Sequence, residues 1–208
     1  MSGSLRCFLL ALLWQLGGIL IAMRYKIVAV GTENVPEKEP VLLLGNHVSW
    51  LDWMFVQLPL RRRIRFMMDK GIYEWKMLRW LFRFGRTIPI SAKASKGAFS
   101  MAERALSAGE AVGMFPEGGI TRTCEMEKFY RGFEIIASRS TGGVIVPFYI
   151  GGMCGSIFAP APGRYTEKSV CFRRQVTVVY GAPMPLESSA EAVRTSVAHL
   201  KDTLAEQT

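Results

Sequence analysis

Short apolar runs alternate along this chain with segments of helical pattern, and this alternation constrains the fold more than any other feature. The strand-like runs are residues 25–30, 41–45, 64–68, 87–90, 111–115, 143–150 and 176–180. The helical patterns are residues 49–58, 72–84, 95–108, 129–140 and 189–205. Strands separated by helices are typical of an α/β fold, so we expect a central, mostly parallel sheet flanked by helices.

The run 41–45 (VLLLG) is apolar at four consecutive positions, which predicts a strand buried on both faces. Gly109 follows the amphipathic pattern 95–108 and is the expected left-handed residue after that helix. The Gly- and Pro-rich stretch 151–163 is expected to be a surface loop. No internal repeat is visible, which indicates one domain over residues 25–208.

The N-terminal segment 1–24 differs from the rest of the chain. Between Cys7 and Met23 the only strongly polar side chain is Gln15. Seventeen helical residues would extend about 25 Å, slightly less than the roughly 30 Å of a bilayer's hydrocarbon core. We therefore expect an apolar membrane-anchoring helix in front of the domain.

Several arrangements of this segment remain open. A helix half-inserted at the interface is favoured, because Trp14 and the flanking Arg6 and Arg24 suit the headgroup region. A true span requires a thinned bilayer, and a buried core helix is the remaining structural alternative. A secretory signal peptide is disfavoured because no clear cleavage pattern follows the apolar run.

The formal net charge of +9 and the pI near 9.7 predict a polyanionic partner. Because the charge accompanies a long apolar N-terminus and no groove-binding motif, we expect a phospholipid bilayer rather than nucleic acid. The four cysteines show no Cys-x-x-Cys pair and no neighbouring histidine, so we expect no metal site. Scattered thiols fit a reducing, cytosolic location for the domain.

His47 follows the buried strand directly, where active-site groups of open α/β sheets often lie. If Ser49 is the N-cap of the next helix, His47 lies in the preceding loop and Asp52 in the first turn. The loop then folds the imidazole back onto the carboxylate, giving a His–Asp pair that activates a substrate hydroxyl. Spacing alone leaves open a purely structural role for both residues. His199 is expected to be a solvated residue of the C-terminal helix.

A second cluster, Phe115-Pro116-Glu117-Gly118-Gly119, also follows a buried strand. A Gly-rich turn at a strand end allows main-chain N–H groups to approach an anion closely. Cations also follow the predicted strand ends, namely Lys70, Lys93, Arg122 and Lys128. They form either a phosphate pocket or a solvated basic rim, and for Lys128 the rim is preferred.

Together these residues resemble the glycerolipid acyltransferase family, typified by the bacterial lysophosphatidic acid acyltransferases. The resemblance rests on four blocks in order, which are Asn46-His47 with Asp52, Gly85-Arg86-Thr87-Ile88-Pro89-Ile90, Phe115-Pro116-Glu117-Gly118 and Val146-Pro147. They cover residues 41–147, about half of the chain, and 181–183 (GAP) resembles the family's closing strand and turn.

The resemblance implies an O-acyltransferase without a cofactor, whose donor substrate is acyl-CoA or acyl-carrier protein and whose acceptor is a lysophospholipid. His47 is then the general base and Asp52 its orienting partner. Acceptor binding falls to Glu117, Gly118, Arg122, Arg86, Lys70 and Lys93. It also implies attachment to the cytoplasmic face of an inner membrane.

The expected acceptor is 1-acylglycerol-3-phosphate, as in phospholipid biosynthesis. The run FPEGGITRT is closest to 2-acylglycerophosphoethanolamine acyltransferases, because Gly119 and Ile120 stand where the common pattern has Thr-Arg. Lys93 likewise stands where an arginine is common. Recycling of that lysolipid is therefore the alternative. Rival classes are an ester hydrolase using the same pair and a membrane-docking lipid-binding module without catalysis.

Overall fold

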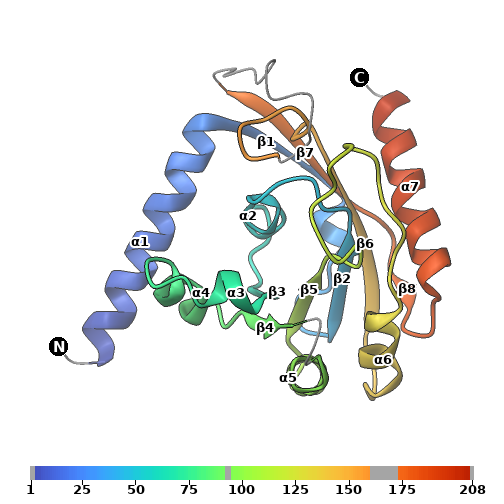
Figure 1. Cartoon of the computed structure of the whole chain (residues 1–208), viewed down its shortest axis with the longest axis horizontal. Helices are drawn as coiled ribbons and strands as arrows, with labels where there is room; N and C mark the ends of the chain where they lie inside the picture. Colours follow the sequence, from blue (N-terminus) through green and yellow to red (C-terminus); the bar gives the residue numbers. More distant parts are fainter. Residues whose placement is uncertain (1–2, 92–94, 160–172, 207–208) are drawn as a thin grey trace.

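The structure, a computed structural model, describes residues 3–91, 95–159 and 173–206, and its strands form one eight-stranded sheet (Figure 1). The strands are β1 (Tyr25–Val30), β2 (Val41–Gly45), β3 (Ile64–Asp69), β4 (Ile88–Ile90), β5 (Ala111–Met114), β6 (Val144–Gly151), β7 (Arg174–Tyr180) and β8 (Met184–Pro185). Their order is β1-β7-β6-β2-β5-β3-β4, and β8 pairs with β6. The predicted α/β class is confirmed.

Strand direction changes once across this order. Strands β6, β2, β5, β3 and β4 are parallel to one another. Strand β7 pairs antiparallel with β6, and β1 pairs parallel with β7. The sheet is therefore mostly parallel, as predicted, while β1 and β7 run opposite to the central strands.

Helices cover both faces of the sheet, as Figure 1 shows. On one side lie α1 (Gly3–Arg24) and α2 (Asp52–Gln57), with α3 (Lys70–Tyr73) and α4 (Arg79–Phe84) beside them. On the other side lie α5 (Lys96–Ser107), α6 (Gly132–Ser138) and α7 (Ala190–Glu206). A short 3-10 helix, η1 (Thr32–Asn34), lies in the turn between β1 and β2.

Strand β2 lies at the centre of the sheet, and its side chains alternate between the two layers. Leu42 and Leu44 pack with α5, α6 and α7, whereas Val41 and Leu43 pack with α2. All four are fully buried. Alternation with apolar side chains on both faces is what a central parallel strand requires, so the reading of VLLLG as a doubly buried strand is confirmed.

The single helix predicted for residues 72–84 is wrong, because the chain forms α3 and α4 with a turn between them. Asp69 accepts hydrogen bonds from the N–H groups of Gly71 and Ile72, which starts a short helix at Lys70. In one continuous helix Trp75 and Phe82 would share a face. Instead Phe82 is buried and Trp75 is exposed, so the turn separates them.

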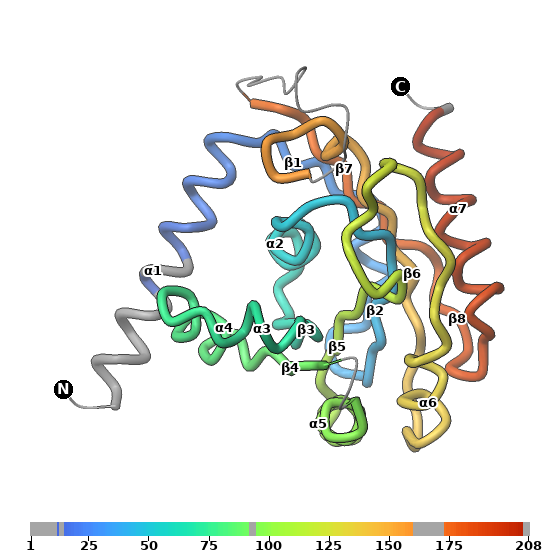
Figure 2. The backbone as a smooth tube through the Cα atoms, viewed as in Figure 1, coloured from blue at the N-terminus to red at the C-terminus, as the bar shows by residue number. Residues whose placement is uncertain are grey.

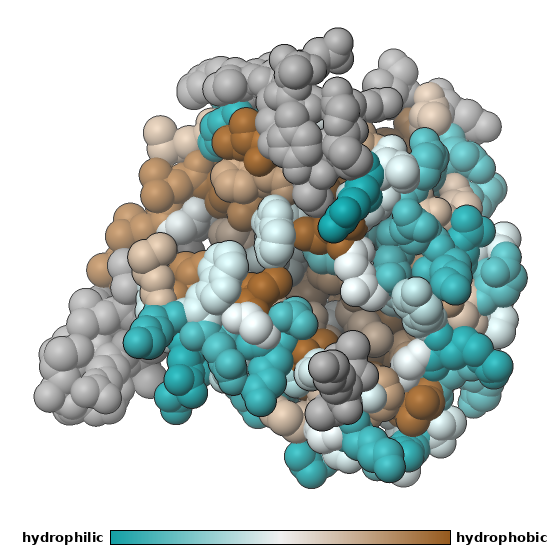
Figure 3. All heavy atoms as spheres, viewed as in Figure 1, coloured by the Kyte–Doolittle hydropathy of each residue, from teal (hydrophilic) through white to brown (hydrophobic). Residues whose placement is uncertain are grey.

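Helix α1 continues directly into β1, with no residue between Arg24 and Tyr25. Its described apolar side chains are largely exposed, and Figure 3 shows hydrophobic residues gathered along it. These side chains are Leu12, Leu16, Ile19, Leu20 and Met23. No helix in the described part of the chain combines the length and apolar character needed to cross a bilayer. The anchoring role of segment 1–24 stays a prediction.

The central position of β2 predicts a large cost for a cavity there. Leu43→Ala should lower the free energy of unfolding by about 2–5 kcal/mol, because the surrounding sheet and α2 collapse only partly into the space. Leu20→Ala removes the same atoms from a side chain that is 66% exposed. It should change the free energy of unfolding by less than about 0.5 kcal/mol. Denaturant unfolding of both variants in detergent measures the difference, and equal effects would contradict the assigned core.

Candidate active site

His47 and Asp52 meet at the carboxyl end of β2. The Nδ1 atom of His47 lies 2.8 Å from Oδ2 of Asp52. The Asp52 side chain is fully buried, while 19% of the imidazole is exposed. The loop therefore folds the imidazole back onto the carboxylate, as the spacing predicted, and the other ring nitrogen, Nε2, remains for a substrate.

Asp52 also organises the loop that carries His47. Its Oδ2 accepts the main-chain N–H groups of Val48 at 2.6 Å and Ser49 at 2.8 Å, and the Ser49 hydroxyl donates to Oδ1. The predicted N-cap role of Ser49 is wrong, since Leu51 precedes α2 and Ser49 donates to Asp52 instead. A carboxylate that accepts these donors holds a negative charge beside the imidazole and favours the tautomer with the proton on Nδ1.

The imidazole lies flat on the ring of Phe115, which follows β5. The two ring centroids are 4.1 Å apart with an interplanar angle of 14°. Phe115 in turn stacks on Phe66 of β3 and meets Phe148 of β6 edge-on. This aromatic support was not predicted, because a contact between the two rings requires their strands to be neighbours, and the sequence does not give the strand order.

Glu117 lies directly behind His47 and is only 6% exposed. One carboxyl oxygen accepts the main-chain N–H of His47 at 3.0 Å, and the other accepts that of Glu127 at 3.2 Å. Burial raises the pKa of Glu117 to about 7, although the two N–H donors oppose the shift. The structure thus accounts for Glu117 through main-chain contacts, and its predicted contact with an acceptor headgroup stays a prediction.

Two further residues, to which the sequence analysis assigned no role, fix this loop. The N–H of Thr121 donates to the carbonyl of His47 at 2.8 Å. The side-chain amide of Asn46 bridges both main-chain groups of Ile150, donating to the carbonyl at 3.0 Å and accepting from the N–H at 2.7 Å. The loop around His47 is therefore bound to the segment that follows β5 and to the end of β6.

Gly118 turns the chain after Glu117, with φ of +75°, and its N–H donates to the carbonyl of Phe115 at 3.1 Å. A side chain here would be strained by this φ, and its Cβ would approach the Tyr130 ring to 3.2 Å. The turn that was predicted from the glycines is present. The Gly118 N–H itself is engaged within that turn.

The structure separates the predicted cations. Arg122 lies exposed on the segment that contacts His47, and Lys70 follows β3 at the same edge of the sheet, 3.8 Å from Glu74. Arg86 precedes β4, at the opposite edge, where it pairs with Glu110. Lys93 lies outside the described residues.

Glu110 accounts for the position of Arg86. Burial would raise the pKa of Glu110, but the guanidinium groups of Arg65 and Arg86 hold it below 4.5. The arrangement therefore does not bring Arg86 to His47. Its prediction came from its place in a sequence block, although Arg86 precedes the predicted strand 87–90, whereas His47 follows a strand.

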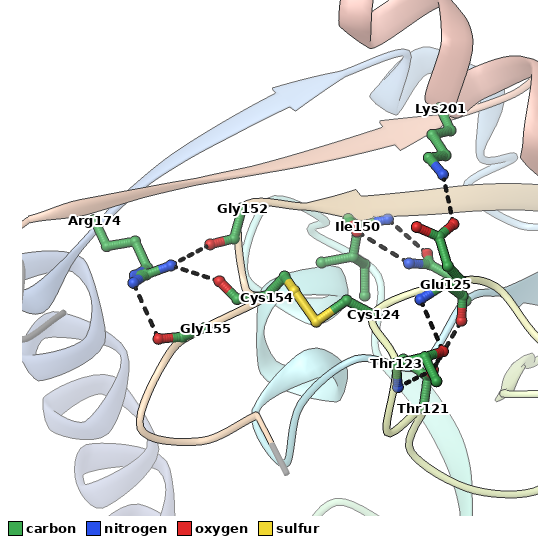
Figure 4. The surroundings of a disulfide bond; sticks show 11 residues. Thr121, Thr123, Cys124, Glu125, Ile150, Gly152, Cys154, Gly155, Arg174 and Lys201 are labelled. Atoms are coloured by element: carbon green, nitrogen blue, oxygen red, sulfur yellow. Dashed lines mark hydrogen bonds and ion pairs between the residues drawn. A yellow bond between two sulfur atoms is a disulfide. The ribbon is translucent and has the colours of Figure 1, made fainter. Parts of the chain in front are cut away.

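The interpretation of the cysteines as scattered thiols is wrong for two of the four. Cys124 and Cys154 form a disulfide with a Cα–Cα distance of 5.7 Å (Figure 4). They are 30 residues apart, and only the fold brings the segments after β5 and β6 together, as the trace in Figure 2 shows. Among the described residues, no group of three or more His, Cys, Asp or Glu side chains is placed to hold a metal ion.

The raised pKa of Glu117 predicts a pH-dependent stability. Because the folded protein holds this proton up to about pH 7, against 4.5 ordinarily, the contribution of Glu117 falls as the pH rises between these values. The free energy of unfolding of the wild type, relative to Glu117→Gln, should therefore decrease by about 3 kcal/mol from pH 4.5 to 7.

The denaturant concentrations at the unfolding midpoint, measured at pH values across this range, test this prediction. Glu187→Gln alters an exposed carboxylate and should follow the wild type at every pH. The amide at position 117 offers one acceptor oxygen instead of two, so a constant offset is also expected. A difference between wild type and Glu117→Gln that does not vary with pH would overturn the assignment.

The chain is similar to several known proteins. The chain is 28% identical to a chloroplastic 1-acyl-sn-glycerol-3-phosphate acyltransferase of Arabidopsis thaliana over 147 residues, 69% of this chain and 40% of that protein. A protein of the same name from Chlamydomonas reinhardtii is 26% identical over 80% of this chain and 49% of its own length. The chain thus spans about half the length, or less, of these curated relatives.

The fold is shared with the crystal structure of the 1-acyl-sn-glycerophosphate acyltransferase PlsC from Thermotoga maritima. The TM-score is 0.72 at 21% identity, covering 97% of this chain and 80% of that chain. The sequence profile of the acyltransferase family matches residues 26–151, which is more than half of the chain and contains His47, Asp52 and Glu117. The chain therefore belongs to the acyltransferase family.

Proposed function

We propose that this protein transfers a fatty acyl group from a thioester donor to the free hydroxyl of a lysophospholipid, with 1-acylglycerol-3-phosphate as the acceptor. The observation that carries the proposal is the 2.8 Å contact between His47 and the buried Asp52. The relatives named as 1-acyl-sn-glycerol-3-phosphate acyltransferases support the choice of acceptor.

His47 is the proposed general base. Its Nε2 removes the proton from the acceptor hydroxyl as the oxygen attacks the thioester carbonyl, and Asp52 stabilises the imidazolium that forms. A carbon–oxygen bond forms, the tetrahedral oxyanion collapses, and the carbon–sulfur bond breaks. The proton then passes from His47 to the departing thiolate of coenzyme A or acyl-carrier protein.

The oxyanion requires a donor near the Gly-rich turn. Because the Gly118 N–H is engaged with Phe115, we assign this role to the N–H of Gly119. A Cβ at Gly119 would meet no atom within 4 Å, so the turn leaves space for a substrate there. Arg122, on the same segment, is the proposed partner of the acceptor phosphate.

The exposed apolar side chains support the proposed association with a bilayer. Besides those of α1, Trp50 and Trp75 stack on one another at 6.5 Å and are both about half exposed. Tryptophan is favoured at the membrane interface. We also propose attachment through residues 1–24, which the apolar segment and the positive charge support, with the domain on the cytoplasmic face, which the family resemblance implies.

Loss of the proposed base should greatly slow turnover while leaving the fold intact. His47→Ala should lower kcat by about 10²–10⁴, the scale for removing a positioned general base. His199→Ala removes the chain's other histidine, from α7, and should retain wild-type activity. Detergent-solubilised protein is assayed with labelled acyl-CoA and acyl-carrier protein, each with lysophosphatidic acid and with lysophosphatidylethanolamine.

Each possible product of this assay supports a different conclusion. Diacyl product that requires His47 supports the proposal, and the preferred acceptor distinguishes the biosynthetic from the recycling reaction. Free fatty acid without a lysolipid indicates a hydrolase. Formation of diacyl product by His47→Ala at the wild-type rate would contradict the proposed role of His47 as general base.

The proposed phosphate contact predicts a change in acceptor affinity. Arg122→Ala should raise KM for lysophosphatidic acid about tenfold, the effect of losing one charged hydrogen bond, with a smaller change in kcat. Arg104→Ala removes an exposed arginine of α5 and serves as the matched control. Equal KM values for the two variants would remove Arg122 from the acceptor site.

A further inference from the structure

The Cys124–Cys154 disulfide joins two of the segments that surround His47 (Figure 4). Cys124 lies two residues after Arg122 and three after Thr121, whose N–H holds the His47 carbonyl. Cys154 lies in the loop after β6. The crosslink therefore connects the segment that carries the proposed acceptor site to a different part of the same sheet edge.

The loop that contains Cys154 is a firm attachment point. Arg174 of β7 donates to the carbonyls of Gly152, Cys154 and Gly155 at 3.0, 2.9 and 3.4 Å. Met153 and Ser156 in this loop are buried. Figure 4 shows the guanidinium among these carbonyls, on the side of the loop away from Cys124.

The segment that contains Cys124 is attached less firmly to the rest of the domain. Its ends are fixed by Thr121, which binds His47, and by Glu127, whose N–H binds Glu117. Between them, the hydrogen bonds are local to the stretch. The Thr121 hydroxyl donates to the Glu125 carbonyl at 2.8 Å, and the N–H groups of Thr123 and Glu125 donate to the hydroxyls of Thr121 and Thr123 at 3.3 Å. The Glu125 carboxylate also pairs with Lys201 of α7 at 3.1 Å, but Glu125 is 73% exposed. Exposed pairs of this kind hold a chain weakly. The disulfide is the covalent restraint on this stretch.

We propose that the Cys124–Cys154 disulfide is a reducible positioning element for acceptor binding, which holds the segment that carries Arg122 in place next to His47. This inference rests on the proposed function. A dithiol reductant supplies two electrons and two protons, the sulfur–sulfur bond breaks, and Cys124 and Cys154 become thiols while the reductant closes to its own disulfide. The freed segment then presents Arg122 less effectively, and the acceptor binds more weakly.

Kinetics of the oxidised and dithiothreitol-treated full-length protein test this inference. Reduction should raise KM for lysophosphatidic acid about fivefold, less than the effect of deleting Arg122, and change kcat less than about twofold. In the Arg122→Ala variant, reduction should cause no further increase in KM, because the crosslink acts through that side chain. An unchanged KM in the reduced wild type would overturn the proposal.

Two cysteine variants identify the thiols responsible. A double variant, Cys124→Ser with Cys154→Ser, should have the KM of the reduced wild type with or without dithiothreitol. The matched double variant, Cys7→Ser with Cys171→Ser, should retain the full response. If the response to dithiothreitol is lost in the Cys7→Ser, Cys171→Ser variant but kept in the Cys124→Ser, Cys154→Ser variant, the effect belongs to Cys7 and Cys171. That result would overturn the proposal.

Amide hydrogen exchange separates this inference from the proposed function. Reduction should speed exchange in residues 122–126 and leave α5 unchanged. If no acyl transfer occurs in either redox state, the proposed function fails, and exchange still decides the positioning role. Exchange in 122–126 that is the same before and after reduction overturns it.

Discussion

The buried carboxylate of Asp52 is the group on which the arrangement of the site depends. One side chain with no exposed surface accepts the imidazole of His47, two main-chain N–H groups and a hydroxyl. Burying a charge is costly unless donors satisfy it, and here the donors come from the same six-residue stretch. The loop therefore folds around the carboxylate, and the orientation of His47 follows from the electrostatics of Asp52.

The loop is completed by groups from distant parts of the chain. Glu117 and Thr121, which follow β5, hold the main-chain N–H and carbonyl of His47. Asn46 holds Ile150 at the end of β6. Because β5 and β6 are the two neighbours of β2, the strand order brings these segments to His47. A parallel sheet collects the ends of strands that are far apart in sequence, and the site makes use of that property.

Local features of the site and fold could be predicted from the sequence. The bounds of β1 and β2 match the predicted runs, and His47 and Asp52 are only five residues apart, so loop geometry determines their contact. Contacts that require the strand order could not be predicted. The stacking of Phe115 on His47 and the Cys124–Cys154 disulfide both join separate segments, and no periodicity indicates either.

The disulfide also bears on the expected location. Structural disulfides persist in oxidising compartments, while cytosolic ones are usually transient and redox-sensing. The predicted cytoplasmic location and the crosslink are compatible when the disulfide is transient and redox-sensing. Its place beside the segment of Arg122, rather than in the hydrophobic core, suits a bond that is made and broken without unfolding the sheet.

The reversed direction of β1 has a mechanical consequence. Because β1 runs opposite to β2, its first residue, Tyr25, lies at the sheet edge where β2 ends, and α1 joins it without a linker. Figure 1 shows α1 descending from that edge along the side of the domain. The orientation of α1 is thus coupled directly to that of the sheet, because no flexible linker separates them. When α1 lies on a surface, its direct join to β1 therefore sets the distance between that surface and the active site. It also sets the angle at which the active site faces the surface.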